Sequence, residues 1–182
     1  KIRGVRAPHP QDPAKTVMQV FDLSSGGANL LKTHHCTGKI EFWKWVQLNT
    51  LAFVTAEAVF HWCLDAEGEP TLMFNRDPRV GQRVLSYHTD TQNMWLALTG
   101  VTLDPATRQM SGNVQIHSVQ QGSATVRPGY SCCFQDLQYE NAKCDVMVIA
   151  AAEGGQGTFT VAEMPVAGKV PSYPRGQSNF QV

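Results

Sequence analysis

The chain has 182 residues, enough for one domain with a core, and its 15 basic and 15 acidic residues cancel to a net charge of zero. This balance does not favour attraction by bulk charge to nucleic acid or to an anionic membrane surface. No apolar run approaches the roughly 18 residues that a transmembrane helix needs. The start, KIRGVRAPHP, lacks the apolar region of a signal peptide and has no Met, so we expect a piece of a longer protein.

Taken in chain order, β-branched, aromatic and alternating segments predict strands throughout. Pro8–Lys15 is expected to be a loop because of its three prolines, and the Pro/Gly/Ser-rich tail from Pro165 is expected to be loop as well. No segment shows a sustained helical period. The expected strands are Lys1–Val5, Thr16–Leu23, Ile40–Val46, Thr50–Thr55, Ala58–Leu64, Val84–His88, Trp95–Val101, Gly112–Val119, Ser131–Gln138, Cys144–Ala150 and Thr158–Glu163.

One two-strand unit recurs along the chain. LAFVT, LALTGV and VMVIAA are each followed by a polar turn and by a second strand, AVFHWCL, NVQIHSV or TFTVAEM. The repeat units lie at roughly 1–23, 40–64, 83–119 and 130–163, with a loop-rich end at 164–182. Units of about 40–50 residues that cannot bury their apolar face alone are typical of β-propellers. The expected fold class is therefore all-β, a β-propeller, with an all-β sandwich as the alternative.

The cysteines lack the paired spacing of a zinc site, and we expect buried, reduced thiols. A metal site at His34, His35 and Cys36 is the alternative, although three neighbours on one extended segment cannot all face one ion. No P-loop, GxSxG, GxGxxG or HExxH motif is present, so neither catalysis nor a cofactor is expected. His88 and Asp90, in YHTD, could suggest an acid–base pair, but we interpret this segment as a pinned turn. The cysteines are Cys36, Cys63, Cys132, Cys133 and Cys144.

The tryptophan-rich segment Phe42–Trp62, FWKWVQLNTLAFVTAEAVFHW, closely resembles the N-terminal propeller of the clathrin heavy chain. MFNR, SYHTD, WLALTGV and QIHSV resemble further tracts of that family in the same order. The resemblance is strong over Thr16–Val119 and weakens through Tyr130–Glu163. It implies about blades 2 to 5 of a seven-bladed ring, with Trp43 or Trp45 packed between adjacent sheets.

The resemblance also implies a function. Such a propeller is not an enzyme but docks short peptide motifs of adaptor and accessory proteins in grooves between blades, during coated-vesicle formation and endocytosis. It would act in the cytoplasm at coated pits and vesicles, reaching the membrane indirectly and binding no nucleic acid. Contacts with clathrin light chain, and trimerisation, would use other parts of the heavy chain. The alternatives are a propeller scaffold of another trafficking or signalling complex, and a propeller enzyme or carbohydrate-binding module.

Three peptide sites are implied by the resemblance. The first groove would take acidic-hydrophobic "clathrin box" peptides, with attraction from Lys32 or Arg3 where the family has a lysine pair. The second would take tryptophan-containing peptides near the ring axis, and the third would use an exposed Trp95 as an anchor for an aliphatic side chain. Each site could instead be ordinary core. The expected residues are Arg3, Gln19, Phe21 and Lys32 for the first, Arg83, Leu85 and Val101 for the second, and Trp95, Ile116 and Gln121–Val126 for the third.

Overall fold

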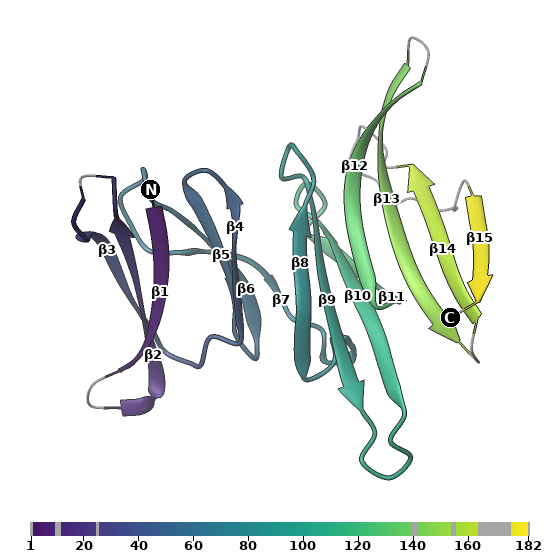
Figure 1. Ribbon diagram of the computed structural model, residues 1–182, viewed down its shortest axis with the longest axis horizontal. Helices are drawn as coiled ribbons and strands as arrows, with labels where there is room; N and C mark the ends of the chain where they lie inside the picture. The colour runs from purple at the N-terminus through teal and green to yellow at the C-terminus, as the bar shows by residue number, and fades with distance from the viewer. Residues whose placement is uncertain are drawn as a thin grey trace. The chain divides into compact units, whose positions relative to one another are not determined.

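Antiparallel strands make up nearly all of the computed structural model, which describes residues 2–9, 12–24, 26–139, 142–153, 156–163 and 176–181 (Figure 1). One 3-10 helix, η1 (Pro78–Val80), is the only helical element in these ranges. None of the described helical structure has the length and hydrophobicity required to cross a bilayer. The chain divides into two compact units, Lys1–Asn75 and Arg76–Val182, which we describe separately.

The first unit contains two antiparallel sheets whose strands follow one another in chain order. The first sheet has the described strands β1 (Ile2–His9), β2 (Asp12–Asp22) and β3 (Asn29–Cys36). The second has β4 (Phe42–Gln47), β5 (Thr50–Val54), β6 (Ala58–Cys63) and β7 (Thr71–Asn75).

The core of the first unit joins these two sheets. The cluster consists of Met18, Val20, Cys36, Ile40, Leu51, Phe53 and Trp62, and comes from both sheets and the segment between them. Trp43 and Trp45 are partly buried against this cluster. The expectation that one of these two tryptophans packs between adjacent sheets is therefore confirmed.

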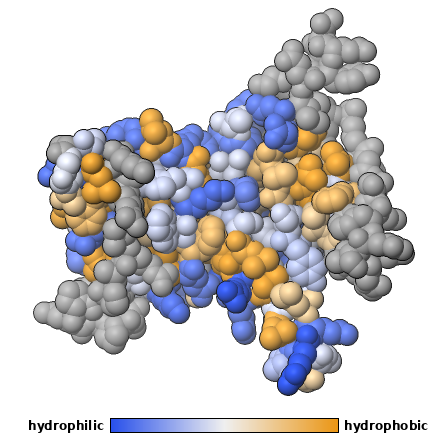
Figure 2. Space-filling model, viewed as in Figure 1, coloured by the Kyte–Doolittle hydropathy of each residue, from blue (hydrophilic) through white to orange (hydrophobic). Residues whose placement is uncertain are grey.

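The second unit also contains two sheets in chain order. One has β8 (Arg83–Thr89), β9 (Trp95–Leu103), β10 (Met110–Ser118) and β11 (Ser123–Pro128), and the other has β12 (Ser131–Tyr139), β13 (Ala142–Glu153), β14 (Gln156–Glu163) and β15 (Gly176–Gln181). Strand β12 contacts β8 and β9. Apolar side chains gather over β12 and β13 (Figure 2). The shared core is formed by Trp95, Ala97, Val114, Ile116, Cys132, Met147, Ile149 and Ala162.

Four strands were not expected from the sequence: β3, β7, β11 and β15. Each is the last strand of its sheet and pairs with a single neighbour among the described strands. The sequences of these four strands lack a strong apolar–polar alternation, so backbone pairing with the preceding strand decides their conformation. The tail from Pro165 was expected to be loop, but within it β15 pairs with β14.

The predicted loop Pro8–Lys15 is also corrected. Strand β1 continues to His9 and β2 begins at Asp12, while Pro10 and Gln11 lie outside the described residues. The register changes at this end, because Pro8 pairs with Thr16 but His9 pairs with Asp12. Pro13 therefore falls outside the regular ladder, where the missing N–H of proline costs no strand hydrogen bond.

Candidate functional site

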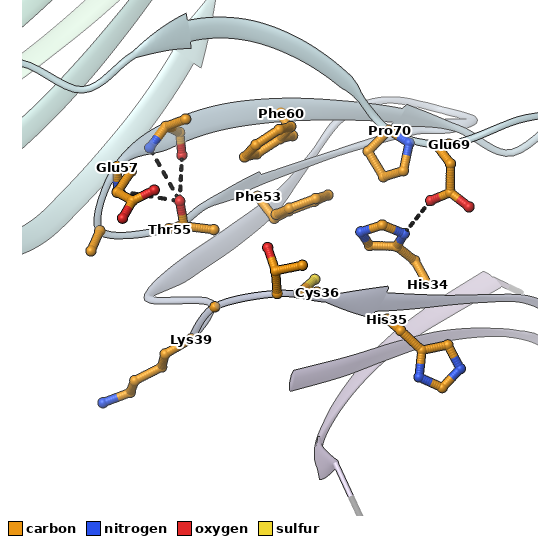
Figure 3. A pocket seen from close by; sticks show the side chains of 14 residues that line it. His34, His35, Cys36, Lys39, Phe53, Thr55, Glu57, Phe60, Glu69 and Pro70 are labelled. Atoms are coloured by element: carbon orange, nitrogen blue, oxygen red, sulfur yellow. Dashed lines mark hydrogen bonds and ion pairs between the residues drawn. The ribbon is translucent and has the colours of Figure 1, made fainter. Parts of the chain in front are cut away.

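A cavity of about 330 Å³ opens in the first unit beside β3 and the β5–β6 hairpin (Figure 3). We call it the β3–β6 groove. It is lined by residues 34–39, Phe53, 55–58, Phe60, Glu69 and Pro70. Its walls thus come from both sheets of this unit and from the segments that follow β3 and β6.

Two stacked phenylalanines form the apolar part of the groove. Phe53 on β5 and Phe60 on β6 are register partners, and their rings stack with centroids 5.1 Å apart and planes 15° apart. Phe53 is buried, whereas Phe60 is half-buried and offers part of its ring to the cavity. Cross-strand aromatic pairs of this kind stabilise a sheet and also leave a rigid apolar surface.

A contact between the His34 imidazole and the Glu69 carboxylate lies at one end of the groove. His34 Nδ1 lies 2.7 Å from Glu69 Oε2, and the His34 ring lies 5.8 Å from both the Phe53 ring and the Trp62 ring. The imidazole side chain is 17% exposed but the Glu69 side chain is 85% exposed. The carboxylate of Glu69 can therefore accept a further hydrogen bond from outside.

The opposite end of the groove is the β5–β6 turn. The Thr55 hydroxyl accepts hydrogen bonds from the backbone N–H of Glu57 at 3.3 Å and of Ala58 at 3.1 Å. The Ala58 carbonyl in turn accepts one from the Thr55 N–H at 2.9 Å. These bonds fix the turn and leave Glu57 exposed beside the cavity.

The Cys36 thiol lines the groove but is not poised for chemistry. Burial, together with the negative charge of Glu69, raises the pKa of Cys36 to about 11. A thiol with this pKa is protonated at neutral pH, and the thiolate is the reactive form. Among the side chains that the structure describes, no group of three His, Cys, Asp or Glu residues could hold a metal ion.

The expectation of buried thiols is correct for two of the four cysteines whose side chains are described. Cys36 and Cys132 are buried, and burial raises the pKa of Cys132 to about 12. Cys63 and Cys133 are exposed, because each alternates with a buried neighbour along its strand. Cys144 lies where side chains are not described.

In the first expected peptide site, backbone pairing brings two of the four residues together. Arg3 is the register partner of Phe21, and Gln19 pairs with Val5 on one side and Thr33 on the other. The side chains of Gln19 and Phe21 are both half-buried. Partial exposure of this kind is compatible with a contact surface.

Lys32 does not have the free position that attraction of an acidic peptide would require. Its Nζ donates hydrogen bonds to the backbone carbonyls of Cys63, at 3.0 Å, and Ala66. The same nitrogen lies 5.9 Å from the centroid of the Trp62 ring, within cation–π range. Lys32 thus links β3 to the last residue of β6 and to the segment after it, a contact that depends on tertiary structure.

The second expected site has one clearly exposed apolar residue. Arg83 pairs with Val101, and the register between β8 and β9 shifts between Val84 and Ser86. Leu85 sits in this irregularity and is 42% exposed, while Val101 is buried and Arg83 is exposed. Bulge-type irregularities re-aim side chains, which accounts for an apolar residue that faces outward here.

The third expected site lacks its exposed anchor. Trp95 is 2% exposed and Ile116 is 1% exposed, and both belong to the core cluster of the second unit. Trp95 packs inward because β9 is a central strand whose residues are all buried from Trp95 to Val101. Residues 121–126 on the neighbouring edge are exposed or half-buried. Trp95 is therefore a core residue and is not available to a peptide as an exposed anchor.

The β3–β6 groove itself was not predicted. From the sequence, His34, His35 and Cys36 were considered only as possible metal ligands. In the structure, His34 faces the groove and Glu69, whereas His35 points away from it (Figure 3). The sequence of the β5–β6 hairpin could have indicated the apolar part of the groove, because its short turn places Phe53 opposite Phe60.

The described strands define a protein of the β-propeller class, built from successive antiparallel sheets. No protein-family model matches the chain. Over nearly its whole length it is nevertheless similar to clathrin heavy chains, which confirms the resemblance drawn from its sequence.

Three relatives illustrate the extent of the similarity. Clathrin heavy chain 2 of Homo sapiens is 31% identical over 93% of this chain. The clathrin heavy chains of Drosophila melanogaster and Dictyostelium discoideum are each 28% identical, over 87% and 94% of this chain. The chain spans about a tenth of the length of these relatives, since the matches cover 11%, 10% and 10% of them.

Proposed function

We propose that this chain is part of a clathrin-type propeller that docks short linear motifs of adaptor and accessory proteins during coat formation. The role is one of binding without catalysis, in the cytoplasm at the face of coated pits and vesicles. The observation that carries the proposal is Leu85, which is held outward at a strand irregularity next to exposed Arg83.

A leucine exposed on a rigid sheet can bind one apolar side chain of an extended peptide. The neighbouring guanidinium of Arg83 can stack on an indole or pair with a carboxylate. One such contact is weak, and a coat that carries many copies gains avidity. This combination favours tryptophan-containing or acidic-hydrophobic motifs as ligands.

The expected residues take different roles within this proposal. Gln19 and Phe21, with Arg3 paired opposite Phe21, form the first contact surface, and Arg83 with Leu85 forms the second. Val101, Trp95 and Ile116 are buried in the second unit, where Val101 is the register partner of Arg83. Lys32 maintains the structure of the first unit.

The test is fluorescence anisotropy of the whole chain with two labelled peptides, one of the clathrin-box type and one with a central tryptophan. We expect both to bind. Leu85→Asp should weaken the tryptophan peptide by about tenfold, the loss of about 1.4 kcal/mol expected at a contact residue. The same substitution at Leu48, which is 86% exposed outside these surfaces, should leave binding within about twofold.

Binding of neither peptide would contradict the proposal and would favour a propeller scaffold of another complex. Equal effects of Leu85→Asp and Leu48→Asp would contradict the assignment of the second surface.

A further inference from the structure

We propose that the β3–β6 groove is a separate docking site for an extended peptide whose apolar residues are flanked by basic ones. This inference goes beyond the proposed function. None of the residues assigned above to peptide binding lines the groove, and its charge favours ligands of the opposite kind.

The apolar part of the proposed ligand follows from the rings. In Figure 3 the rings of Phe60, Phe53 and Pro70 lie along the cavity, with His34 at the end of the row. A volume of about 330 Å³ can hold one or two aliphatic side chains but does not enclose a large ligand. Phe60 is half-buried, so an apolar side chain placed against it would remove further apolar surface from water.

The charge of the ligand follows from the two carboxylates. Glu57 lies at the β5–β6 turn and Glu69 beside His34, so an acid stands at each end of the row of rings (Figure 3). Lys39 lines the groove, but its side chain extends away from the rings. His34 is already directed at Glu69. The charges that face the cavity are thus complementary to a peptide with a basic residue on each side of its apolar centre.

The backbone favours a peptide over a small molecule. Strand β3 is the outer strand of its sheet in the described chain, and the groove continues along 37–39 after the strand ends. An outer strand beside an apolar cavity allows an extended segment to add to the sheet while its side chains enter the cavity. The net charge of the chain is zero, so general attraction of a basic peptide would not explain selective binding.

The probe is a fluorescein-labelled ten-residue peptide with a central Leu-Ile pair and two lysines on each side, compared with the same peptide carrying glutamates. Anisotropy is measured with the whole chain at physiological ionic strength. We expect the lysine peptide to bind and the glutamate peptide to bind at least about tenfold more weakly.

Two matched variants test the location. Glu57→Lys should weaken the lysine peptide by about fivefold or more, because it replaces an attraction with a repulsion at the groove. Glu67→Lys makes the same charge change at an exposed residue outside the lining and should change affinity by less than about twofold. Both residues are exposed, so neither variant is expected to disturb folding, and circular dichroism checks this.

The outcomes separate this inference from the proposed function. Failure of the lysine peptide to bind, or equal losses in both variants, overturns the groove assignment and leaves clathrin-box binding untouched. If the lysine peptide binds but the clathrin-box and tryptophan peptides do not, the proposed function is overturned and the groove assignment stands. Displacement of the lysine peptide by unlabelled clathrin-box peptide would also overturn the claim of a separate site.

Discussion

Asp90 and Trp95 hold each other through reciprocal hydrogen bonds across the turn between β8 and β9. The Asp90 carboxylate accepts a bond from the Trp95 N–H at 3.0 Å, and the Trp95 carbonyl accepts one from the Asp90 N–H at 3.0 Å. The same carboxylate oxygen accepts a bond from the Met94 N–H at 2.7 Å. Asp90 is buried and its carboxylate is directed at the backbone, which supports its interpretation as a turn residue instead of a catalytic acid.

Replacing Asp90 should therefore lower stability. Asp90→Ala leaves the buried N–H of Trp95 and the partly buried N–H of Met94 without their acceptor, and we expect the free energy of unfolding to fall by about 2–3 kcal/mol. Asp90→Asn keeps a neutral acceptor and should lose about half as much. Urea denaturation measures both. Equal stability of Asp90→Ala and wild type would contradict the role of Asp90 in pinning this turn.

Lys32 gives a second prediction, because its ammonium group donates hydrogen bonds to the end of β6 and to the segment after it. Lys32→Met keeps the aliphatic stem but removes the donor, and should lower the free energy of unfolding by about 1 kcal/mol. Lys39→Met is the matched control, since no hydrogen bond or ion pair of Lys39 is found within the described residues. If Lys32→Met instead leaves stability unchanged and weakens the clathrin-box peptide, the structural role assigned to Lys32 is wrong.

A comparison of alanine substitutions at two glycines with positive φ distinguishes the cost of backbone strain from that of a steric clash. Gly81 has a φ of 95°, and a Cβ there would lie 2.5 Å from the Val101 carbonyl carbon and from Thr102 Oγ1. Gly26 has a φ of 78° with nothing within 4 Å of such a Cβ. We expect Gly26→Ala to cost about 1 kcal/mol through strain alone.

Gly81→Ala should cost at least about 3 kcal/mol, because the clash adds to the strain. Thermal unfolding of the two variants under identical conditions provides the measurement. A Gly81→Ala variant no less stable than Gly26→Ala would show that η1 and β9 can separate here without penalty.

A fourth prediction concerns pH. Burial lowers the pKa of His61 to about 4, below the ordinary value of 6.5. Between these values the unfolded chain binds a proton that the folded chain does not, so stability should fall as the pH drops from 6.5 towards 4. The expected loss between pH 7 and pH 5 is up to about 2 kcal/mol from this residue.

Urea midpoints at pH 7 and pH 5 test this expectation, with His61→Gln as the variant that cannot titrate. Its pH dependence should be shallower than that of wild type by the same amount. His117, whose pKa burial also lowers, contributes in the same direction in both proteins. Identical slopes for wild type and His61→Gln would exclude the assignment to His61.

The sequence was sufficient for every strand of each sheet except the last one in chain order. Phe53 and Leu51 lie on a strand with a strong apolar signal, and the LAFVT segment was correctly placed. The strand that carries Lys32 and His34 was missed because its sequence, NLLKTHHC, lacks an apolar–polar alternation, although exposed residues do alternate with more buried ones along it in the structure. Its conformation depends on pairing with β2, a non-local contact that no short window can reveal.

The exposure of the candidate site residues also depends on tertiary structure that the sequence pattern does not specify. An apolar residue such as Trp95 can be anchor or core, and its burial is decided by the whole sheet and its neighbour. Leu85 is exposed only because the register shifts beside it, and the sequence pattern does not specify that shift. The groove depends on Phe53, Glu57 and Glu69 meeting residues of β3, which requires the packing of two sheets.

That packing has a consequence for how the first unit unfolds. Met18 and Val20 of one sheet share a buried cluster with Leu51 and Trp62 of the other. Each sheet therefore needs the other to bury these side chains. The two sheets should therefore gain and lose structure together, as one cooperative block in hydrogen exchange. Amides of β2 and β5 would show matching protection, and a ligand bound in the β3–β6 groove would slow exchange in both.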